Sequence, residues 1–110
     1  MSDITTLLFR RACREDVSRL VQLLADDPLG AKRELYEEPL PTSYLTAFAA
    51  IEADSNNELV VACLGDEIVG LLQITFIPYL TLQGSWRALI EGVRVDSRFR
   101  SRGFGKALLT

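Results

Sequence analysis

Residues 93–109, near the end of the 110-residue sequence, combine basic side chains with two closely spaced glycines. An apolar strand is followed by a short basic loop, and Gly103 and Gly105 then begin a predicted helix. The first turn of a helix offers unpaired N–H groups and the positive end of the helix dipole, and glycine lets an anion approach them closely. Side-chain charge that suits a group such as a pyrophosphate is added by Arg100, Arg102 and Lys106. The pattern predicts an anion-binding loop.

Two common phosphate-binding motifs do not fit this segment. A P-loop ending at Lys106 would place Arg100 at its first glycine and Ala107 at its Ser/Thr position. A dinucleotide-binding motif beginning at Gly103 would place Leu108 at its third glycine. The spacing that does occur is R-x-x-G-x-G, directly between a strand and a helix.

This segment resembles the core motif of the GNAT superfamily of acyl-CoA-dependent N-acyltransferases, in which an apolar strand, a polar loop and [Q/R]-x-x-G-x-[G/A] precede a helix. The string IEGVRVDSRFRSRGFGKALL (90–109) is similar to that motif, except that Ser97 stands where many members have proline. Residues 9–24 are similar to the family's first strand and helix, and residues 58–77 to its central hairpin. The resemblance covers nearly the whole chain, although only the motif is specific.

The resemblance implies where acetyl-CoA binds. The fourth strand, splayed from its neighbour, is expected to pair with the pantetheine arm through Val93, Arg94 and Val95. The Val93 amide is expected to polarise the thioester carbonyl as an oxyanion-hole donor does. The CoA pyrophosphate is expected on backbone amides of the loop, with Lys106 at its edge, and the loop residues are Arg100, Ser101, Arg102, Gly103, Phe104 and Gly105.

Glu91 is the candidate catalytic residue. It is the only acid in the strand, and it lies two residues before Val93, so strand alternation predicts that both side chains point to one face. A carboxylate beside the thioester can take a proton from the attacking amine, and partial burial is expected there. The alternative is that Glu91 forms an ion pair with Arg87 or Arg94 and does not titrate.

The activity that the resemblance implies is N-acyl transfer: an amine attacks the thioester of acetyl-CoA directly, in a ternary complex, without a metal. The acceptor is expected to be a small-molecule or peptide amine. The alternative is a non-catalytic acyl-CoA-binding or interaction domain that retains the pyrophosphate loop. The sequence does not identify the acceptor. It also does not determine whether the protein forms a homodimer.

Composition excludes several other functions. The sequence has no histidine, which excludes Ser-His-Asp and Cys-His catalysis, imidazole zinc sites and histidine pH switches. Cys13 and Cys63 form no C-x-x-C pair, which favours a reduced, cytoplasmic setting. Cys63 is expected to be a small buried side chain, because no histidine is present to activate it as a nucleophile. No signal peptide or membrane-length apolar run is visible, so no membrane association is expected.

The formal net charge is −3, and the charged residues are distributed unevenly along the sequence. No Lys or Arg occurs between Arg33 and Arg87, while eight acids do. Either these four residues border the acceptor site, where the acids attract a cationic amine, or they belong to a solvated loop: Tyr36, Glu37, Glu38 and Tyr44. The basic cluster is short and belongs to an acidic protein, so nucleic-acid binding is not expected. Three aromatic residues are expected either in the core or around an acceptor pocket: Phe76, Tyr79 and Trp86.

Hydrophobic periodicity predicts the elements that position these residues. Their order is β-α-α-β-β-β-α, in a single α/β domain of the α+β type, with a mostly antiparallel sheet flanked by helices. Residues 26–30 are expected to be a turn, and 31–42 either a loop or a loop that contains a helical turn, while Ser43 is expected to cap the second helix. Strands are predicted at 6–12, 58–64, 67–77 and 86–95, and helices at 15–25, at 43–53 and from 103 onward.

The family pattern continues beyond the last residue of this sequence. After the glycine loop, relatives have a complete helix, further strands and a further helix, and many carry a tyrosine there that protonates the leaving thiolate. The sequence ends at Thr110, about two turns into the predicted helix and without a capping signal. We therefore expect residues 1–110 to be an incomplete acetyltransferase domain, truncated in the helix that follows the fourth strand.

Overall fold

The computed structural model describes residues 7–99. The predicted anion-binding loop, Arg100 through Lys106, and the helix expected from Gly103 lie outside the described residues. Among the described residues, no helix is long and apolar enough to cross a membrane.

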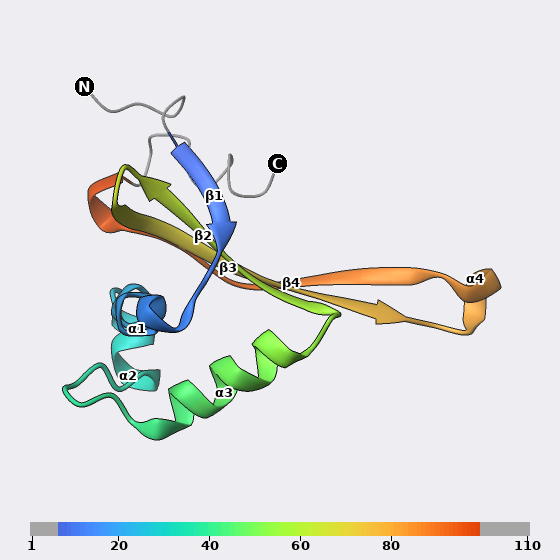
Figure 1. Ribbon diagram of the computed structural model, residues 1–110, viewed down its shortest axis with the longest axis horizontal. Coiled ribbons are helices and arrows are strands. Elements are labelled where there is room, and N and C mark those ends of the chain that lie inside the picture. The colour runs from blue at the N-terminus through green and yellow to red at the C-terminus, as the bar shows by residue number, and fades with distance from the viewer. Residues whose placement is uncertain (1–6, 100–110) are drawn as a thin grey trace.

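The fold is a mixed α/β arrangement built on an open sheet of four strands, as the sequence predicted (Figure 1). The strands lie in sequence order, β1-β2-β3-β4, and every neighbouring pair is antiparallel. Gly65, with a φ of 58°, turns the chain tightly between the second and third strands, in the segment that resembles the family's central hairpin. The strands are β1 (Leu7–Arg11), β2 (Asn57–Leu64), β3 (Glu67–Pro78) and β4 (Trp86–Val95).

The helices predicted at 15–25 and 43–53 are both present, and the structure adds one helix between them, a short turn between the third and fourth strands, and two 3-10 turns. The helix expected at 43–53 begins at Thr42, so Ser43 lies inside its first turn and the prediction that Ser43 caps it was wrong. Pro41 precedes the helix with an extended backbone and provides no side-chain cap. The helical elements are α1 (Val17–Leu24), α2 (Pro28–Arg33), α3 (Thr42–Ala53), the short turn α4 (Thr81–Gly84), and two 3-10 turns, Arg14–Asp16 and Ser97–Phe99.

The added helix is α2, which the sequence analysis divided between a turn and a loop. Asp27 caps this helix by accepting a hydrogen bond from the Gly30 backbone N–H, and Pro28 occupies its first position. Gly30 packs directly on the end of α1, where an added Cβ would lie 1.9 Å from the Leu24 carbonyl oxygen. Only glycine allows the chain to turn this closely after α1.

Helices α1 and α3 cover one face of the sheet. Leu20 and Leu23 of α1 pack on Val61 and Cys63 of β2, and Phe48 of α3 joins the same layer. Cys63 is buried, as predicted, and belongs to this core. The opposite face of the sheet carries a second apolar cluster: Leu7, Ala62, Val69 and Leu72, with Val93 and Val95 packed against it. The sheet therefore has an apolar layer on both faces, as in folds with layers on each side of a sheet.

Asp16 fixes the connection between β1 and α1. Its carboxylate accepts hydrogen bonds from Arg10 Nη1 at 2.7 Å, Arg10 Nη2 at 3.1 Å and the Cys13 backbone N–H at 2.8 Å. The Arg10 guanidinium is the main reason that the pKa of Asp16 falls from its ordinary value of 3.8 to about 2. The carboxylate is also largely shielded from water, so its negative charge depends on these donors.

We expect Asp16→Asn to lower the free energy of unfolding by about 2 kcal/mol near pH 7. A lowered pKa stabilises the fold above the ordinary pKa, and this stabilisation is lost as pH falls from about 4 to about 2. The difference between variant and wild type should therefore shrink over that range in urea unfolding. Glu58→Gln, which removes a surface partner of Arg11, serves as the control and should cost less than about 1 kcal/mol. A pH-independent difference for Asp16→Asn would contradict this account.

Candidate functional site

Gly92 creates a β-bulge in the middle of β4. Arg94 pairs with Leu71 and Glu91 pairs with Gln73, so two residues of β4 oppose the single residue between them on β3. Gly92 adopts a φ of 65°, the left-handed conformation that glycine adopts readily and that favours this kind of bulge. A bulge leaves the extra residue outside the regular hydrogen-bond ladder. Backbone groups at this point of β4 are therefore available to something other than β3.

The bulge reverses the alternation of side chains, and the prediction that Glu91 and Val93 share a face was wrong. Val93 packs against the cluster on the face away from the helices. Glu91 lies opposite Gln73, which lines a cavity on the helix side, and Arg94 lies opposite Leu71 on that same side. The extra residue shifts the alternation of side chains by one position. Two residues that are two positions apart across the bulge therefore lie on opposite faces of the sheet.

Glu91 is exposed, and no residue between 7 and 99 forms an ion pair with it. The arginines that were expected as alternative partners point elsewhere. Arg94 Nε lies 3.5 Å from Asp27 Oδ2, and the Arg87 guanidinium lies 4.7 Å from the centre of the Tyr79 ring. The carboxylate is thus accessible to a ligand, although the expected partial burial is not found.

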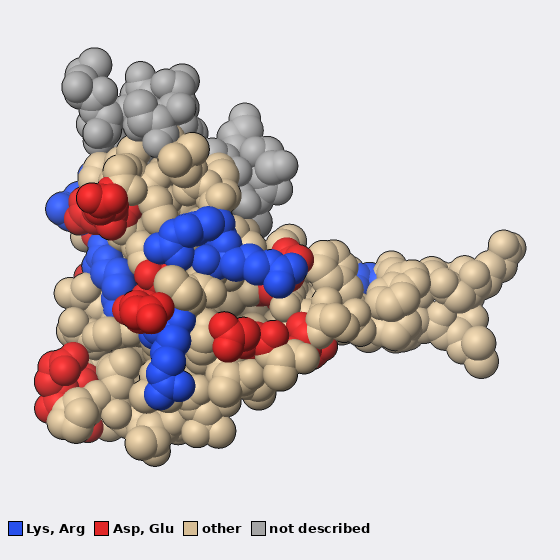
Figure 2. All heavy atoms as spheres, in the orientation of Figure 1, with Lys and Arg blue, Asp and Glu red and all other residues tan. Residues whose placement is uncertain are grey.

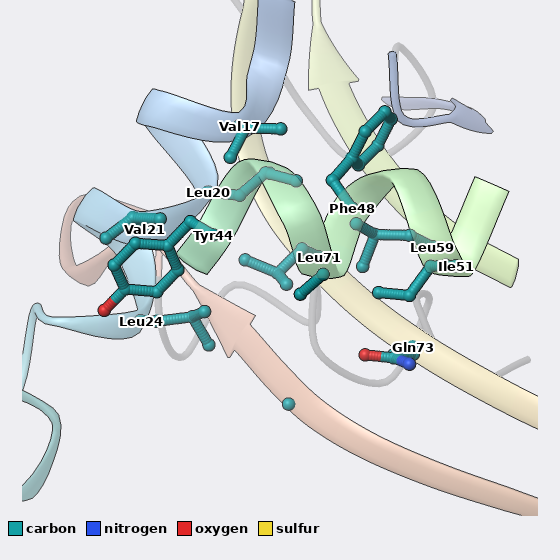
Figure 3. A pocket seen from close by; sticks show the side chains of 12 residues that line it. Val17, Leu20, Val21, Leu24, Tyr44, Phe48, Ile51, Leu59, Leu71 and Gln73 are labelled. Atoms are coloured by element: carbon teal, nitrogen blue, oxygen red, sulfur yellow. The ribbon is translucent and has the colours of Figure 1, made fainter. Parts of the chain in front are cut away.

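A cavity of about 190 Å³ lies between α1, α3 and the sheet, next to the bulge (Figure 3). Its walls are mainly aliphatic and aromatic, and Gly92 is part of them. Gln73 contributes a polar group whose Nε2 donates to Asn57 Oδ1 at 2.9 Å. The wall also includes Leu20, Leu24, Tyr44, Phe48, Ile51 and Leu71. The arrangement suits an apolar group held close to the bulge and to Glu91.

Tyr44 presents its ring to this cavity and turns its hydroxyl away from it (Figure 3). The hydroxyl donates to Glu34 Oε1 at 2.8 Å and accepts from the Leu35 backbone N–H at 2.9 Å. Burial raises the pKa of Tyr44 above its ordinary value of 10.0, so the hydroxyl stays protonated at neutral pH. Of the tyrosines and acids considered around the acceptor, Tyr44 reaches the cavity, while Tyr36 and the loop at 37–38 are exposed.

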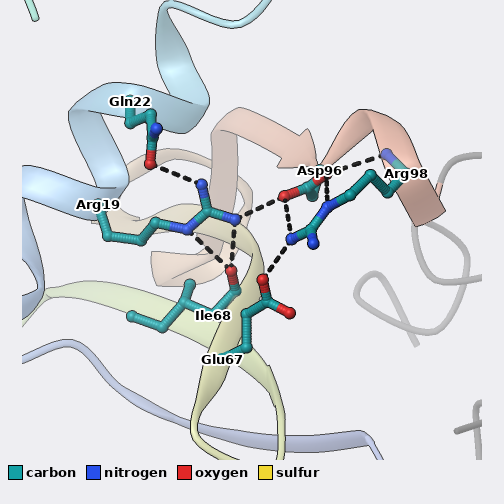
Figure 4. Close-up of polar contacts among 6 residues, drawn as sticks. All are labelled: Arg19, Gln22, Glu67, Ile68, Asp96 and Arg98. Atoms are coloured by element: carbon teal, nitrogen blue, oxygen red, sulfur yellow. Dashed lines mark hydrogen bonds and ion pairs between the residues drawn. The ribbon is translucent and has the colours of Figure 1, made fainter.

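Asp96, directly after β4, was not recognised from the sequence as a site residue. It is only 6% exposed, and its carboxylate accepts from Arg19 Nη2 at 2.6 Å and from the backbone N–H of Arg98 at 2.9 Å (Figure 4). Arg19 also donates to the Ile68 carbonyl, and Arg98 also contacts Glu67. Hydrogen bonds from Arg98 are the main reason that the pKa of Asp96 lies well below its usual range.

This network fixes the chain just before the predicted anion-binding loop. The Asp96 backbone N–H donates to the Val69 carbonyl at 2.8 Å, so both the backbone and the side chain of Asp96 are held to neighbouring elements. The Asp-x-Arg spacing at 96–98 is a usable sequence signal, because aspartate after a strand often accepts from the N–H two residues later. No local sequence pattern identifies Arg19 as the partner of Asp96, because Arg19 lies in α1, 77 positions earlier in the chain.

Three aromatic residues that were expected either in the core or around an acceptor pocket lie outside the core. Phe76, Tyr79 and Trp86 are all more than one-third exposed, and none lines the cavity. They lie at the outer end of the long β3–β4 hairpin, away from α1 and α3. The prediction of a core position was wrong, because these side chains lie beyond the part of the sheet that α1 and α3 cover. Their position around an acceptor pocket stays a prediction. Within residues 7–99, no cluster of three or more His, Cys, Asp or Glu side chains could hold a metal ion.

The sequence model of the acetyltransferase (GNAT) family matches residues 18–110. Among solved structures, a transcriptional regulator from Bacillus halodurans C-125 is 58% identical, with a TM-score of 0.90 over 94% of this chain and 69% of its own. A Trypanosoma brucei acetyltransferase is 28% identical, with a TM-score of 0.72 over 94% and 69% of the two chains. A predicted acetyltransferase with acetyl-CoA from Clostridium acetobutylicum is 18% identical, with a TM-score of 0.67 over 94% and 68%. No curated protein matches the chain.

We expect Asp96→Asn to lower the free energy of unfolding by about 3 kcal/mol, because it removes the buried charge that accepts from Arg98 and from the partly buried Arg19. Glu67→Gln is the matched control, since it removes an exposed partner of Arg98 and should cost less than about 1 kcal/mol. Urea unfolding near neutral pH measures both. Equal costs for the two variants would show that Asp96 is not the centre of this network.

Proposed function

This chain belongs to the GNAT acetyltransferase family, and on that premise we propose that it transfers an acetyl group from acetyl-CoA to an amine. The observation that carries the proposal is the bulge at Gly92, which frees backbone groups of β4 beside an apolar cavity and an accessible carboxylate. An acyl-transfer site needs these three parts: a donor for the carbonyl oxygen, room for the acceptor, and a base.

The edge of β4 supports the proposed binding of acetyl-CoA. Among the described residues β4 is the outer strand, so the backbone of Val93, Arg94 and Val95 can pair with an extended chain such as pantetheine. The room around Gly92 fits this assignment, because the nearest atom to an added Cβ there is Leu24 Cδ2, at 4.0 Å. Acetyl-CoA supplies the activated thioester. The proposed pyrophosphate contacts are those expected from the sequence, at residues 100–106.

In the proposed reaction, Val93 and Glu91 have separate roles. Val93 lies in the bulge, opposite no single residue of β3, and its backbone N–H is the proposed donor to the carbonyl oxygen. The neutral amine nitrogen bonds to the carbonyl carbon, the carbon–sulfur bond breaks, and the thiolate leaves. Glu91 takes the proton that the amine nitrogen loses. No residue forms a covalent intermediate.

The cavity indicates the kind of acceptor. Its volume of about 190 Å³ is smaller than a pocket for a whole drug-sized ligand, so it suits one apolar part of the acceptor. We propose a small-molecule or peptide amine that places an aliphatic or aromatic group between α1 and α3 and its nitrogen near Glu91. The described cysteines, Cys13 and Cys63, are both free, which supports a reducing, cytoplasmic setting.

A second candidate function is acyl-CoA binding without turnover, in a regulatory or interaction domain. The name of the Bacillus halodurans relative favours it, because that protein is called a transcriptional regulator and is 58% identical. The two functions differ in one measurable step, the release of CoA thiol when an amine is present.

We expect the full-length protein to bind acetyl-CoA in isothermal titration and to release CoA thiol with amines that carry an apolar group. Glu91→Gln should lower kcat by about 100-fold, because the base is lost, and leave the KM for acetyl-CoA within about threefold. Glu52→Gln, an exposed acid on α3, is the control and should retain the wild-type rate. Binding without thiol release from any amine would favour the second function. A folded sample that does not bind acetyl-CoA would exclude both.

Two glycine substitutions separate the role of the bulge from its effect on stability. Gly92 and Gly65 both have positive φ, at 65° and 58°, and neither has an atom closer than 4.0 Å to an added Cβ. Gly92→Ala and Gly65→Ala should therefore each cost about 1 kcal/mol of stability. Only Gly92→Ala should lower kcat/KM, by about tenfold or more, because it moves the Val93 amide. Equal kinetics in the two variants would refute the assignment of the oxyanion donor.

A further inference from the structure

Among the described residues, Gln73 alone directs a polar side-chain group into the cavity beside the bulge. Of the other side chains that line it within residues 7–99, only Tyr44 has a polar atom, and its hydroxyl is turned away (Figure 3). Charged side chains gather on the surface of the body of the molecule, and none of the described ones lines the cavity (Figure 2). A polar group of a ligand in this cavity therefore meets Gln73 in otherwise apolar surroundings.

Asn57 fixes the orientation of the Gln73 amide. Gln73 Nε2 donates to Asn57 Oδ1 at 2.9 Å, and the Thr75 hydroxyl donates to the same oxygen at 3.4 Å. With its nitrogen held by Asn57, the amide directs its oxygen toward the cavity, on the side of Leu71 (Figure 3). Within residues 7–99, no group donates a hydrogen bond to Gln73 Oε1. An amide oxygen only accepts hydrogen bonds, so a ligand satisfies it with an O–H or N–H donor.

Gln73 lies directly opposite Glu91 in the ladder between β3 and β4. Directly opposed residues have Cβ atoms about 4.5–5.5 Å apart. A donor about two or three bonds from an amine held by Glu91 therefore lies within reach of Gln73 Oε1. Room for an apolar group remains between α1 and α3, because an apolar cavity of about 150 Å³ accepts benzene and this one measures about 190 Å³.

We propose that Gln73 determines which acceptors the site takes, because its Oε1 accepts a hydrogen bond from an O–H or N–H next to the reacting amine. The inference rests on the proposed function, since it assigns the amine to Glu91. It narrows the acceptor to amino alcohols and amino amides whose hydroxyl or amide neighbours the amine and whose apolar group fills the cavity. An amine without this donor leaves Gln73 Oε1 unpaired among apolar side chains, which weakens its binding.

Three amines that each carry one phenyl ring test the inference. Phenylethanolamine has a hydroxyl on the carbon next to the amine-bearing carbon, phenylalaninamide has an amide there, and phenethylamine has neither. In assays of CoA thiol release by the full-length protein, kcat/KM for at least one of the first two should exceed that for phenethylamine by about tenfold or more. The better of the two shows whether the preferred donor is a hydroxyl or an amide. The KM for acetyl-CoA should stay within about twofold across the three amines.

Gln73→Leu removes the accepting oxygen and keeps a side chain of similar size. It should lower the preference by about tenfold, because the loss falls on the amines that carry the donor and leaves kcat/KM for phenethylamine within about threefold. Intrinsic differences in reactivity among the amines cancel in this comparison of variants. Gln22→Leu is the matched control, since it makes the same change at an exposed glutamine of α1 outside the cavity, and it should leave the preference unchanged. Far-UV circular dichroism verifies that both variants are folded.

Binding separates a failure of this inference from a failure of the proposed function. Isothermal titration of the three amines into the full-length protein with CoA, which carries no acetyl group, requires no transfer. A donor-carrying amine should bind about tenfold more tightly than phenethylamine, and Gln73→Leu should remove the difference. Such binding without thiol release from acetyl-CoA would contradict acetyl transfer and support Gln73 as the specificity residue. Equal affinity for the three amines, no binding of any of them, or a preference that Gln73→Leu retains would overturn the inference.

Discussion

The left-handed backbone at Gly92 is the constraint on which the rest of the candidate site depends. One extra residue in β4 shifts the side-chain pattern, so Glu91 and Arg94 lie on the helix side of the sheet while Val93 and Val95 lie on the other. The same residue interrupts the ladder with β3 and forms part of the cavity wall. The carboxylate, the freed backbone groups and the cavity therefore come together at one point because of a single local conformation.

Two buried carboxylates connect the two edge strands of the described sheet to helix α1. Asp16 ties the end of β1 to the start of α1 through Arg10, and Asp96 ties the end of β4 to α1 through Arg19. Each carboxylate is shielded from water and satisfied by guanidinium and backbone donors, so removing one partner leaves an uncompensated charge. Helix α1 thus receives an ion-pair anchor from each edge strand of the described sheet, and it also forms a wall of the cavity.

The surroundings of strands β3 and β4 change along their length. The inner half contains the bulge and packs against α1. Beyond Phe76, whose N–H donates to the Asn56 carbonyl at 2.8 Å, the two strands pair within residues 7–99 only with each other. Gln73 and Glu91, which lie opposite each other, therefore stand near the boundary between a part of the hairpin supported by α1 and β2 and a part supported by its own cross-strand pairs.

Period-2 patterning and the turn residues were sufficient to predict all four strands, and the motif after β4 was sufficient to predict the family, since both are local features of the sequence. Local patterns did not predict features that depend on contacts with residues far away in the sequence. The faces of Glu91 and Val93 require the register of β4 on β3, and α2 requires the packing of Gly30 on Leu24. The ion pair between Arg19 and Asp96 joins residues 77 positions apart. The sequence determined the four strands and the two longer helices of the described residues. Only the tertiary structure decided that α2 forms and which side chains meet, because strand register and helix packing are set by contacts across the whole chain.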